Sequence, residues 1–181
     1  MNWTSNASTY GRLSIALHWL MLILLAAVYA TMEFKGVFPR GSEGRARIMN
    51  LHYVLGLVAF GLAWVRILLR IPGTSPVIDP APPKWQVRLA KAVQGLLYLL
   101  MVGLPLLGWL ALSAHGETVD FFGTPLPSLL AENPTLRRPL KEIHETLATA
   151  GYFLIGLHAA AALFHHYVMR DNTLKLMLPR R

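Results

Sequence analysis

The stretch KEIHETLATAGYFLIGLHAAAALFHHYVMR, residues 141–170, is apolar for most of its length, is basic at both ends and carries histidines at intervals. His144 and His158 lie fourteen positions apart, and at about 100° per residue a helix returns them to within roughly 40° of one face. The same spacing gives a rise of about 21 Å, which places the two imidazoles near opposite edges of a hydrocarbon core about 30 Å thick. Ionisable side chains inside a membrane are costly, so two of them on one face indicate a functional role.

The composition favours a membrane protein. Of the 181 residues, 54% are hydrophobic and 14% are charged, whereas soluble domains carry about 25% charged residues. The net charge of +8 is spread over short segments between apolar stretches, so we expect no binding to nucleic acid. The chain has no cysteine, which excludes disulfides, iron–sulfur clusters, thiolate zinc sites and covalently attached haem.

Four apolar stretches are long enough to cross a bilayer as helices, since a crossing needs about 20 residues. A cleaved signal peptide is the alternative for the first stretch, but the equally apolar segments that follow favour a retained helix. A segment with five prolines, residues 71–83, separates the second and third stretches and forbids a helix interior there. We therefore predict an all-α, integral membrane four-helix bundle that forms one domain over residues 1–181. The expected helices span about residues 12–33, 47–70, 85–114 and 140–170.

The distribution of Lys and Arg predicts the orientation, because these residues are enriched in cytoplasmic loops. With the N-terminus inside, ten basic residues fall on the inner side and seven on the outer side. We therefore expect both termini to be cytoplasmic. The inner set is Arg12, Arg66, Arg70, Lys84, Arg88, Lys91, Arg170, Lys175, Arg180 and Arg181, and the outer set is Lys35, Arg40, Arg45, Arg47, Arg137, Arg138 and Lys141.

Depth in the membrane sorts four histidines into two pairs. His18 lies about two turns into the first helix from the inner face, and His52 lies just over one turn into the second helix from the outer face. His52 therefore matches His144 at the outer level, and His18 matches His158 at the inner level. Each pair joins two different helices, as in bundles that hold a haem with one neutral imidazole on each face of the iron. We predict a haem at each level, with these four histidines as axial ligands to iron.

Small residues near these histidines fit the same prediction. Gly56, Gly151 and the run 159–162 leave room beside the ligands for a broad, flat porphyrin, although close packing of membrane helices also uses small residues. Zinc or copper sites are less well matched, because they need three or four ligands at one point and this spacing supplies two at each level.

His165 follows His158 by seven residues and shares its face at the inner interface. We expect it to line a quinone pocket, where it would donate a hydrogen bond to a carbonyl group. The alternative is an interfacial histidine that contacts water or lipid headgroups.

The sequence closely resembles the bacterial cytochrome b561 family, especially its superoxide oxidase members. The resemblance is carried by LHW (17–19), MEFKGVFPR (32–40), LH (51–52), residues 144–167 and DNTLKLMLPRR (171–181). It implies a cytochrome of the bacterial inner membrane that binds two haem b groups through His18, His52, His144 and His158. It also implies that superoxide from the periplasm gives its electron to haem and that ubiquinone is reduced to ubiquinol. The lipid bilayer, superoxide and ubiquinone are then the partners, and no protein partner is required.

Attraction of superoxide to the outer side would depend on the basic residues there, because a positive field steers anions. Lys35, Arg40, Arg45 and Arg47 supply such a field, and Glu43 with the acidic residues of the other outer loop dilutes it. No catalytic residue is assigned from the sequence. Two other functions fit the same helices: a dihaem anchor and electron-relay subunit for a dehydrogenase or hydrogenase partner, and a haem-free transporter or scaffold.

Overall fold

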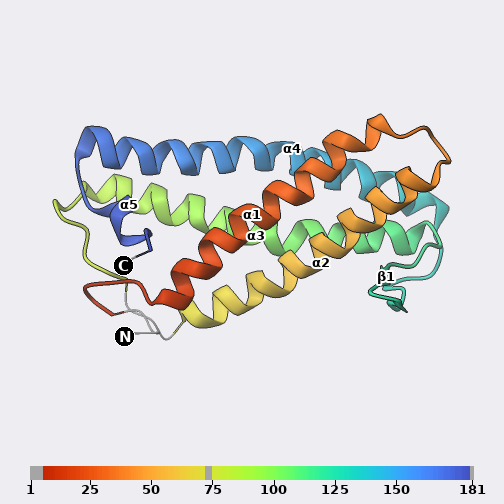
Figure 1. The fold of residues 1–181 in the computed structure, drawn as a ribbon, viewed down its shortest axis with the longest axis horizontal. Helices are drawn as coiled ribbons and strands as arrows, with labels where there is room; N and C mark the ends of the chain where they lie inside the picture. Colours follow the sequence, from red (N-terminus) through yellow and green to blue (C-terminus); the bar gives the residue numbers. More distant parts are fainter. Residues whose placement is uncertain (1–5, 72–74, 180–181) are drawn as a thin grey trace.

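Four long helices make up most of the molecule in a computed structural model that describes residues 6–71 and 75–179 (Figure 1). They are α1 (Arg12–Phe34), α2 (Glu43–Arg70), α3 (Lys84–Ala114) and α4 (Pro134–Phe164). Each is long and apolar enough to cross a membrane. The predicted integral membrane four-helix bundle is confirmed.

The four helices pack in series, each on its neighbour, and do not close into a ring. Helix α2 packs against α1 and α3, and α3 packs against α4. Within the described residues, no Cα atom of α4 comes within 8 Å of a Cα atom of α1 or α2. The backbone of α4 therefore stands apart from α1 and α2, and only side chains reach across that space.

The buried core is small and the apolar surface is large. Met21 and Leu24 of α1 pack with Ala59 and Ala63 of α2 in one buried cluster. Large apolar side chains elsewhere on the helices are exposed, for example Phe153, at 76%. In water such a surface would be unstable, whereas lipid tails solvate it, so this distribution agrees with a bundle that sits in a bilayer.

Two helices begin earlier than the hydrophobic pattern indicates. Helix α2 begins at Glu43, where the Ser42 side chain accepts a hydrogen bond from the backbone N–H of Arg45. Helix α4 begins at Pro134, six residues before the expected start, because the Asn133 side chain caps its first turn. Proline at the first helical position costs no hydrogen bond, since that N–H has no partner inside the helix. The polar first turns thus extend the helices beyond their apolar spans.

The connections between α1 and α2 and between α3 and α4 lie at one end, which we call the hairpin end (Figure 1). A 3₁₀ turn, η1 (Lys35–Val37), follows α1 there. A short antiparallel hairpin, β1 (Asp120–Phe121) and β2 (Thr124–Pro125), interrupts the otherwise helical chain where the sequence indicated only a loop. Phe122 and Gly123 both have positive φ, 53° and 84°, as a two-residue type I′ turn requires.

The opposite end, which we call the α5 end, is closed by the C-terminal segment. A π-helical turn, η2 (His165–Met169), ends at Arg170 in a left-handed conformation, and the short helix α5 (Thr173–Leu176) follows. The indole N–H of Trp19 donates to the carbonyl of Met177 over 2.7 Å, which ties this segment to α1. Three positions considered above lie outside the described residues. They are residues 180–181, which were counted for the orientation, and Pro72 of the proline-rich connector.

Candidate haem sites

One pair of histidines faces across the space between α1 and α4 at the α5 end. The ring centres of His18 and His158 are 6.1 Å apart, with an angle of 65° between the ring planes. The backbones that carry them are not in contact. The predicted inner pair is therefore brought together by side chains alone.

A second pair faces across the space between α2 and α4, toward the hairpin end. The ring centres of His52 and His144 are 6.3 Å apart, at 79°. The two pairs thus lie at different levels of the bundle, and α4 contributes one histidine to each. This is the pairing that depth along the helices indicates.

The spacing within each pair can be compared with that of a metal held between two imidazoles. Two metal–nitrogen bonds of about 2 Å and two rings with a centre-to-nitrogen distance of roughly 1.2 Å place the ring centres about 6.4 Å apart. The observed separations of 6.1 and 6.3 Å agree with this value. In the part of the chain that the structure describes, no three or more His, Asp or Glu side chains gather to hold a bare metal ion. Each pair therefore fits a haem iron with two histidine ligands.

Hydrogen bonds fix the rings of the hairpin-end pair. His144 Nδ1 lies 2.9 Å from the carbonyl oxygen of Leu104 in α3. His52 Nδ1 lies 3.0 Å from Oγ1 of Thr31 and 3.2 Å from the carbonyl oxygen of Val28. The Thr31 hydroxyl donates its hydrogen to Val28, so its oxygen accepts from His52. In both rings Nδ1 is thus the donor and Nε2 is left for a metal, the arrangement common among metal-binding histidines.

Glycines shape the space around the same pair in different ways. A Cβ on Gly56 would meet nothing within 4 Å, so the position beside His52 is open. A Cβ on Gly108 of α3 would lie 3.1 Å from Cε1 of His144, so this glycine makes room for the ligand ring itself. A Cβ on Gly151 would collide with the hydroxyl of Tyr29. Gly151 is therefore explained by close packing of α1 side chains on α4, the alternative considered for the small residues.

A cavity of about 420 Å³ contains the α5-end pair. Its volume is in the range of cofactor sites, about 300–1,000 Å³. Apolar side chains form most of its wall, and Arg66 and Arg70 of α2 are its charged residues; none of the described residues that line it is Asp or Glu. The guanidinium nitrogens of Arg66 lie 3.4 and 3.5 Å from Nδ1 of His18, and one of them donates to the carbonyl of Leu17 over 3.2 Å.

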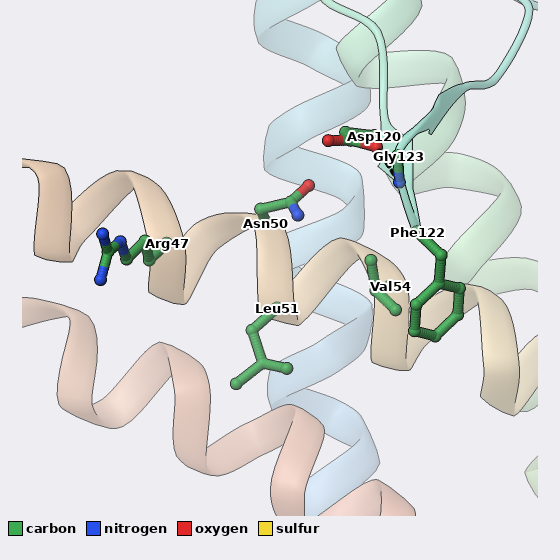
Figure 2. A pocket seen from close by; sticks show the side chains of 7 residues that line it. All are labelled: Arg47, Asn50, Leu51, Val54, Asp120, Phe122 and Gly123. Carbon is green, nitrogen blue, oxygen red and sulfur yellow. Dashed lines mark hydrogen bonds between the residues drawn. The ribbon is translucent and has the colours of Figure 1, made fainter.

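A smaller cavity of about 330 Å³ opens at the hairpin end, between the first turns of α2 and the β1–β2 hairpin. Figure 2 shows Asn50 and Val54 of α2 opposite Asp120 and Phe122, with the guanidinium of Arg47 turned away from the hairpin. Arg47 is paired instead with Glu43 over 2.5 Å at an exposed position.

His165 does not line the large cavity of the α5 end. Its Nδ1 lies 2.5 Å from Oδ2 of Asp171, a residue that is only 2% exposed. Burial alone would raise the pKa of Asp171, but hydrogen bonds from His165 and Thr173 outweigh it and hold the pKa below the ordinary value. Asp171 therefore stays ionised and orients His165. No sequence pattern pointed to Asp171, Arg66 or Gly108, because their roles depend on contacts between separate segments.

Helices of membrane length with two facing histidine pairs place the chain in the class of integral membrane four-helix bundles with paired histidines. The family model described as prokaryotic cytochrome b561 matches residues 9–180. Cytochrome b561 homolog 1 of Escherichia coli (strain K12) is 39% identical over 172 residues, which cover 95% of this chain and 98% of the relative. The probable superoxide oxidase CybB of Yersinia pestis is 37% identical over 172 residues, covering 95% and 97%. Cytochrome b562 of Cereibacter sphaeroides is 32% identical over 176 residues, covering 94% and 96%.

The chain belongs to the prokaryotic cytochrome b561 family. It is accordingly a bacterial integral membrane protein, and the family implies b-type haem, electron transfer in the membrane and oxidoreductase activity.

Proposed function

We propose that this protein is a dihaem cytochrome b that oxidises superoxide at the hairpin end and reduces ubiquinone to ubiquinol at the α5 end. The observation that carries the proposal is the pair of imidazole separations, 6.1 and 6.3 Å, at two levels of one bundle. A relative of 37% identity that bears the name probable superoxide oxidase supports superoxide as the electron donor. On this proposal the hairpin end faces the periplasm, both termini are cytoplasmic, and no protein partner is required.

Four histidines would hold the two haems: His18 with His158, and His52 with His144. Bound haem supplies reversible one-electron chemistry at its iron. The chain fixes the imidazoles through Thr31, Val28 and Leu104 at the hairpin end, and mostly apolar side chains line the cavity around the ligands at the α5 end. In the overall reaction two superoxide ions each lose one electron to become O₂, and ubiquinone gains these two electrons and two protons.

Basic and acidic residues at the hairpin end balance in number, so attraction of an anionic donor would depend on basic side chains that no acidic side chain offsets. Arg47 is neutralised by Glu43, and Arg45 donates to the backbone carbonyls of Lys35 and Phe38. Arg45 keeps its charge in these bonds, because carbonyl oxygens are neutral acceptors. We infer that Lys35, Arg40 and Arg45, rather than Arg47, supply the field that steers superoxide.

His165 is the proposed contact for ubiquinone at the α5 end. Asp171 holds its Nδ1, so Nε2 is the nitrogen that would hydrogen-bond a quinone carbonyl. Because Asp171 accepts from Nδ1, Nε2 carries a hydrogen for a quinone carbonyl only in the protonated imidazole, and that form would then be the proton donor to the reduced quinone. Because His165 lies outside the wall of the large cavity, this quinone site would be separate from the haem space.

The first test is haem content. Purified protein should contain two haems per chain, and His52→Ala or His144→Ala should each leave about one, because a haem with one imidazole lost is held weakly. A matched control is His166→Ala, which changes a histidine of η2 outside both pairs and should keep two. Retention of both haems in the His52→Ala and His144→Ala proteins would refute the pairing at the hairpin end.

The second test is the reaction. The isolated protein, given an enzymatic source of superoxide and a soluble ubiquinone, should form one ubiquinol for every two superoxide ions consumed. The His52→Ala protein should lose this activity. If quinone reduction by the isolated protein is absent and appears only with a co-purified dehydrogenase or hydrogenase, the relay-subunit alternative replaces the proposal.

A further inference from the structure

The two histidine pairs differ in what faces the Nδ1 atoms of their ligands. At the hairpin end, Nδ1 of His52 and Nδ1 of His144 face oxygen acceptors at 2.9–3.2 Å. At the α5 end, Nδ1 of His18 faces the guanidinium of Arg66, whose nitrogens lie at 3.4 and 3.5 Å. A guanidinium has five donors and no acceptor, and it keeps its charge at any pH that a protein tolerates.

A hydrogen-bond acceptor and a cation near a metal-bound imidazole have opposite effects on the stability of the oxidised metal. An acceptor at Nδ1–H increases the basicity of the ring and so stabilises the more positive, oxidised state of a metal bound to Nε2. A fixed cation near the ring disfavours that same state through Coulomb repulsion, strongly so where the surroundings are apolar. Hydrogen bonding around the axial ligands is one of the main factors that set haem potentials.

Arg66 is held in place rather than left to swing away. One of its nitrogens donates to the carbonyl of Leu17 over 3.2 Å, and its guanidinium lies 6.0 Å from the ring centre of Tyr98. It lines the same cavity as His18 and His158, whose described lining contains no Asp or Glu to offset the charge. Its charge therefore acts on the α5-end pair without an acidic neighbour in the wall.

We propose that Arg66 raises the reduction potential of the haem held by His18 and His158 above that of the haem held by His52 and His144. Arg66 is then a positioning residue that makes electron transfer from the hairpin end to the α5 end downhill. This inference rests on the proposed binding of two haems, and it adds an order of potentials that haem binding alone does not require.

The test is a redox titration of the purified holoprotein, followed through the absorbance of both haems. In Arg66→Gln, the midpoint potential of the α5-end haem should fall enough to change the equilibrium between the two haems at least tenfold, which is about 59 mV for a one-electron couple. The hairpin-end haem should move much less. Arg66→Lys should restore most of the potential, because the charge is kept, whereas a structural role of the planar guanidinium would not be rescued.

Arg70→Gln is the matched control. Arg70 lines the same cavity one turn further along α2 and donates to the neutral side-chain oxygen of Gln94 over 3.0 Å, so it keeps its charge. Arg66, by contrast, lies 3.4 Å from Nδ1 of His18. Because Coulomb interactions weaken with distance, removal of Arg70 should shift the potential less. Equal shifts in the Arg66→Gln and Arg70→Gln proteins would overturn the assignment to Arg66. So would an unchanged α5-end potential in an Arg66→Gln protein that keeps both haems, and in that case the dihaem proposal would stand.

Single-haem proteins test the order of potentials without any change at Arg66. His144→Ala should retain the α5-end haem and titrate at the higher potential, and His158→Ala should retain the hairpin-end haem and titrate at the lower one. The reverse order would overturn the inference. A wild-type protein with fewer than two haems would overturn the proposed function itself, so the two failures are distinguishable.

Discussion

Replacement of Gly108 by alanine should weaken haem binding at the hairpin end alone. The added Cβ would lie 3.1 Å from Cε1 and 3.3 Å from Nδ1 of the His144 ring. These are contacts to a ring that is already fixed by a 2.9 Å hydrogen bond to Leu104. The ring must therefore move by a few tenths of an ångström, and that movement stretches the bond that holds its orientation.

The size of the effect follows from the two strains that the methyl group adds. Inserting a methyl group into a packed site costs about 1–3 kcal/mol, and disturbing the partner of a metal-binding histidine lowers metal affinity by about 10–100-fold. Alanine also favours the helix over glycine by up to about 1 kcal/mol, so the fold itself should not be lost. We expect a weaker hairpin-end haem in a protein that remains folded.

Haem loss should be measured by transfer to excess apomyoglobin, with Gly103→Ala as the matched control. Gly103 lies in the same helix, and a Cβ there would meet nothing within 4 Å. Faster loss of one haem in Gly108→Ala but not in Gly103→Ala is the expected result. Equal rates in both variants and in the wild-type protein would show that the glycine is not needed for the position of His144.

Two further predictions concern stability in detergent. Gly151→Ala should lower the free energy of unfolding by about 1–3 kcal/mol, because its Cβ would meet the hydroxyl of Tyr29. Tyr29→Phe alone should cost about 1 kcal/mol through the lost 2.8 Å bond to Ala148, and should make Gly151→Ala less costly in the double variant; strictly additive losses would contradict the contact. Asp171→Asn should cost about 1–3 kcal/mol at pH 7. Since the folded pKa of Asp171 lies below the unfolded value of 3.8, the gap to the wild-type protein should be constant above that value and should close as the pH falls through the folded pKa. A gap that persists at lower pH would contradict the ionised state.

Depth along the helices was predictable from the sequence because it depends only on residue spacing and the helical rise. The level that His18 shares with His158, and the level that His52 shares with His144, could therefore be predicted from the sequence. Which residues face one another around the helix axes could not be derived in this way. The placement of Arg66 against His18 depends on how α2 is rotated relative to α1, and no one-dimensional pattern determines that rotation.

Helix boundaries and the β-hairpin show the same difference between what residue spacing predicts and what it does not. The apolar pattern located all four membrane-spanning helices, but it placed the start of α4 at residue 140 because the six residues before it are mostly polar and include Pro134 and Pro139. The β1–β2 hairpin was missed for a related reason. Its strands have two residues each, too short for an alternating pattern, and its turn has phenylalanine at the first position where Asn or Asp is the usual signal.

If the histidine pairs hold haem as proposed, the separation of α4 from α1 and α2 would give them a structural role as well. Helices in a membrane gain little from the hydrophobic effect when they associate, so they depend on close packing or on polar links between side chains. Among the long helices, and within the described residues, the backbone of α4 comes close to α3 alone. The side chains of Tyr29 and Tyr152 link α1 and α4 through Ala148 and Glu33. Haems held by His18 with His158 and by His52 with His144 would add coordinate bonds that link α4 to α1 and to α2 at two levels. The glycine beside His52 and the apolar cavity around His18 are then understandable as space kept between helices, and not as imperfect packing.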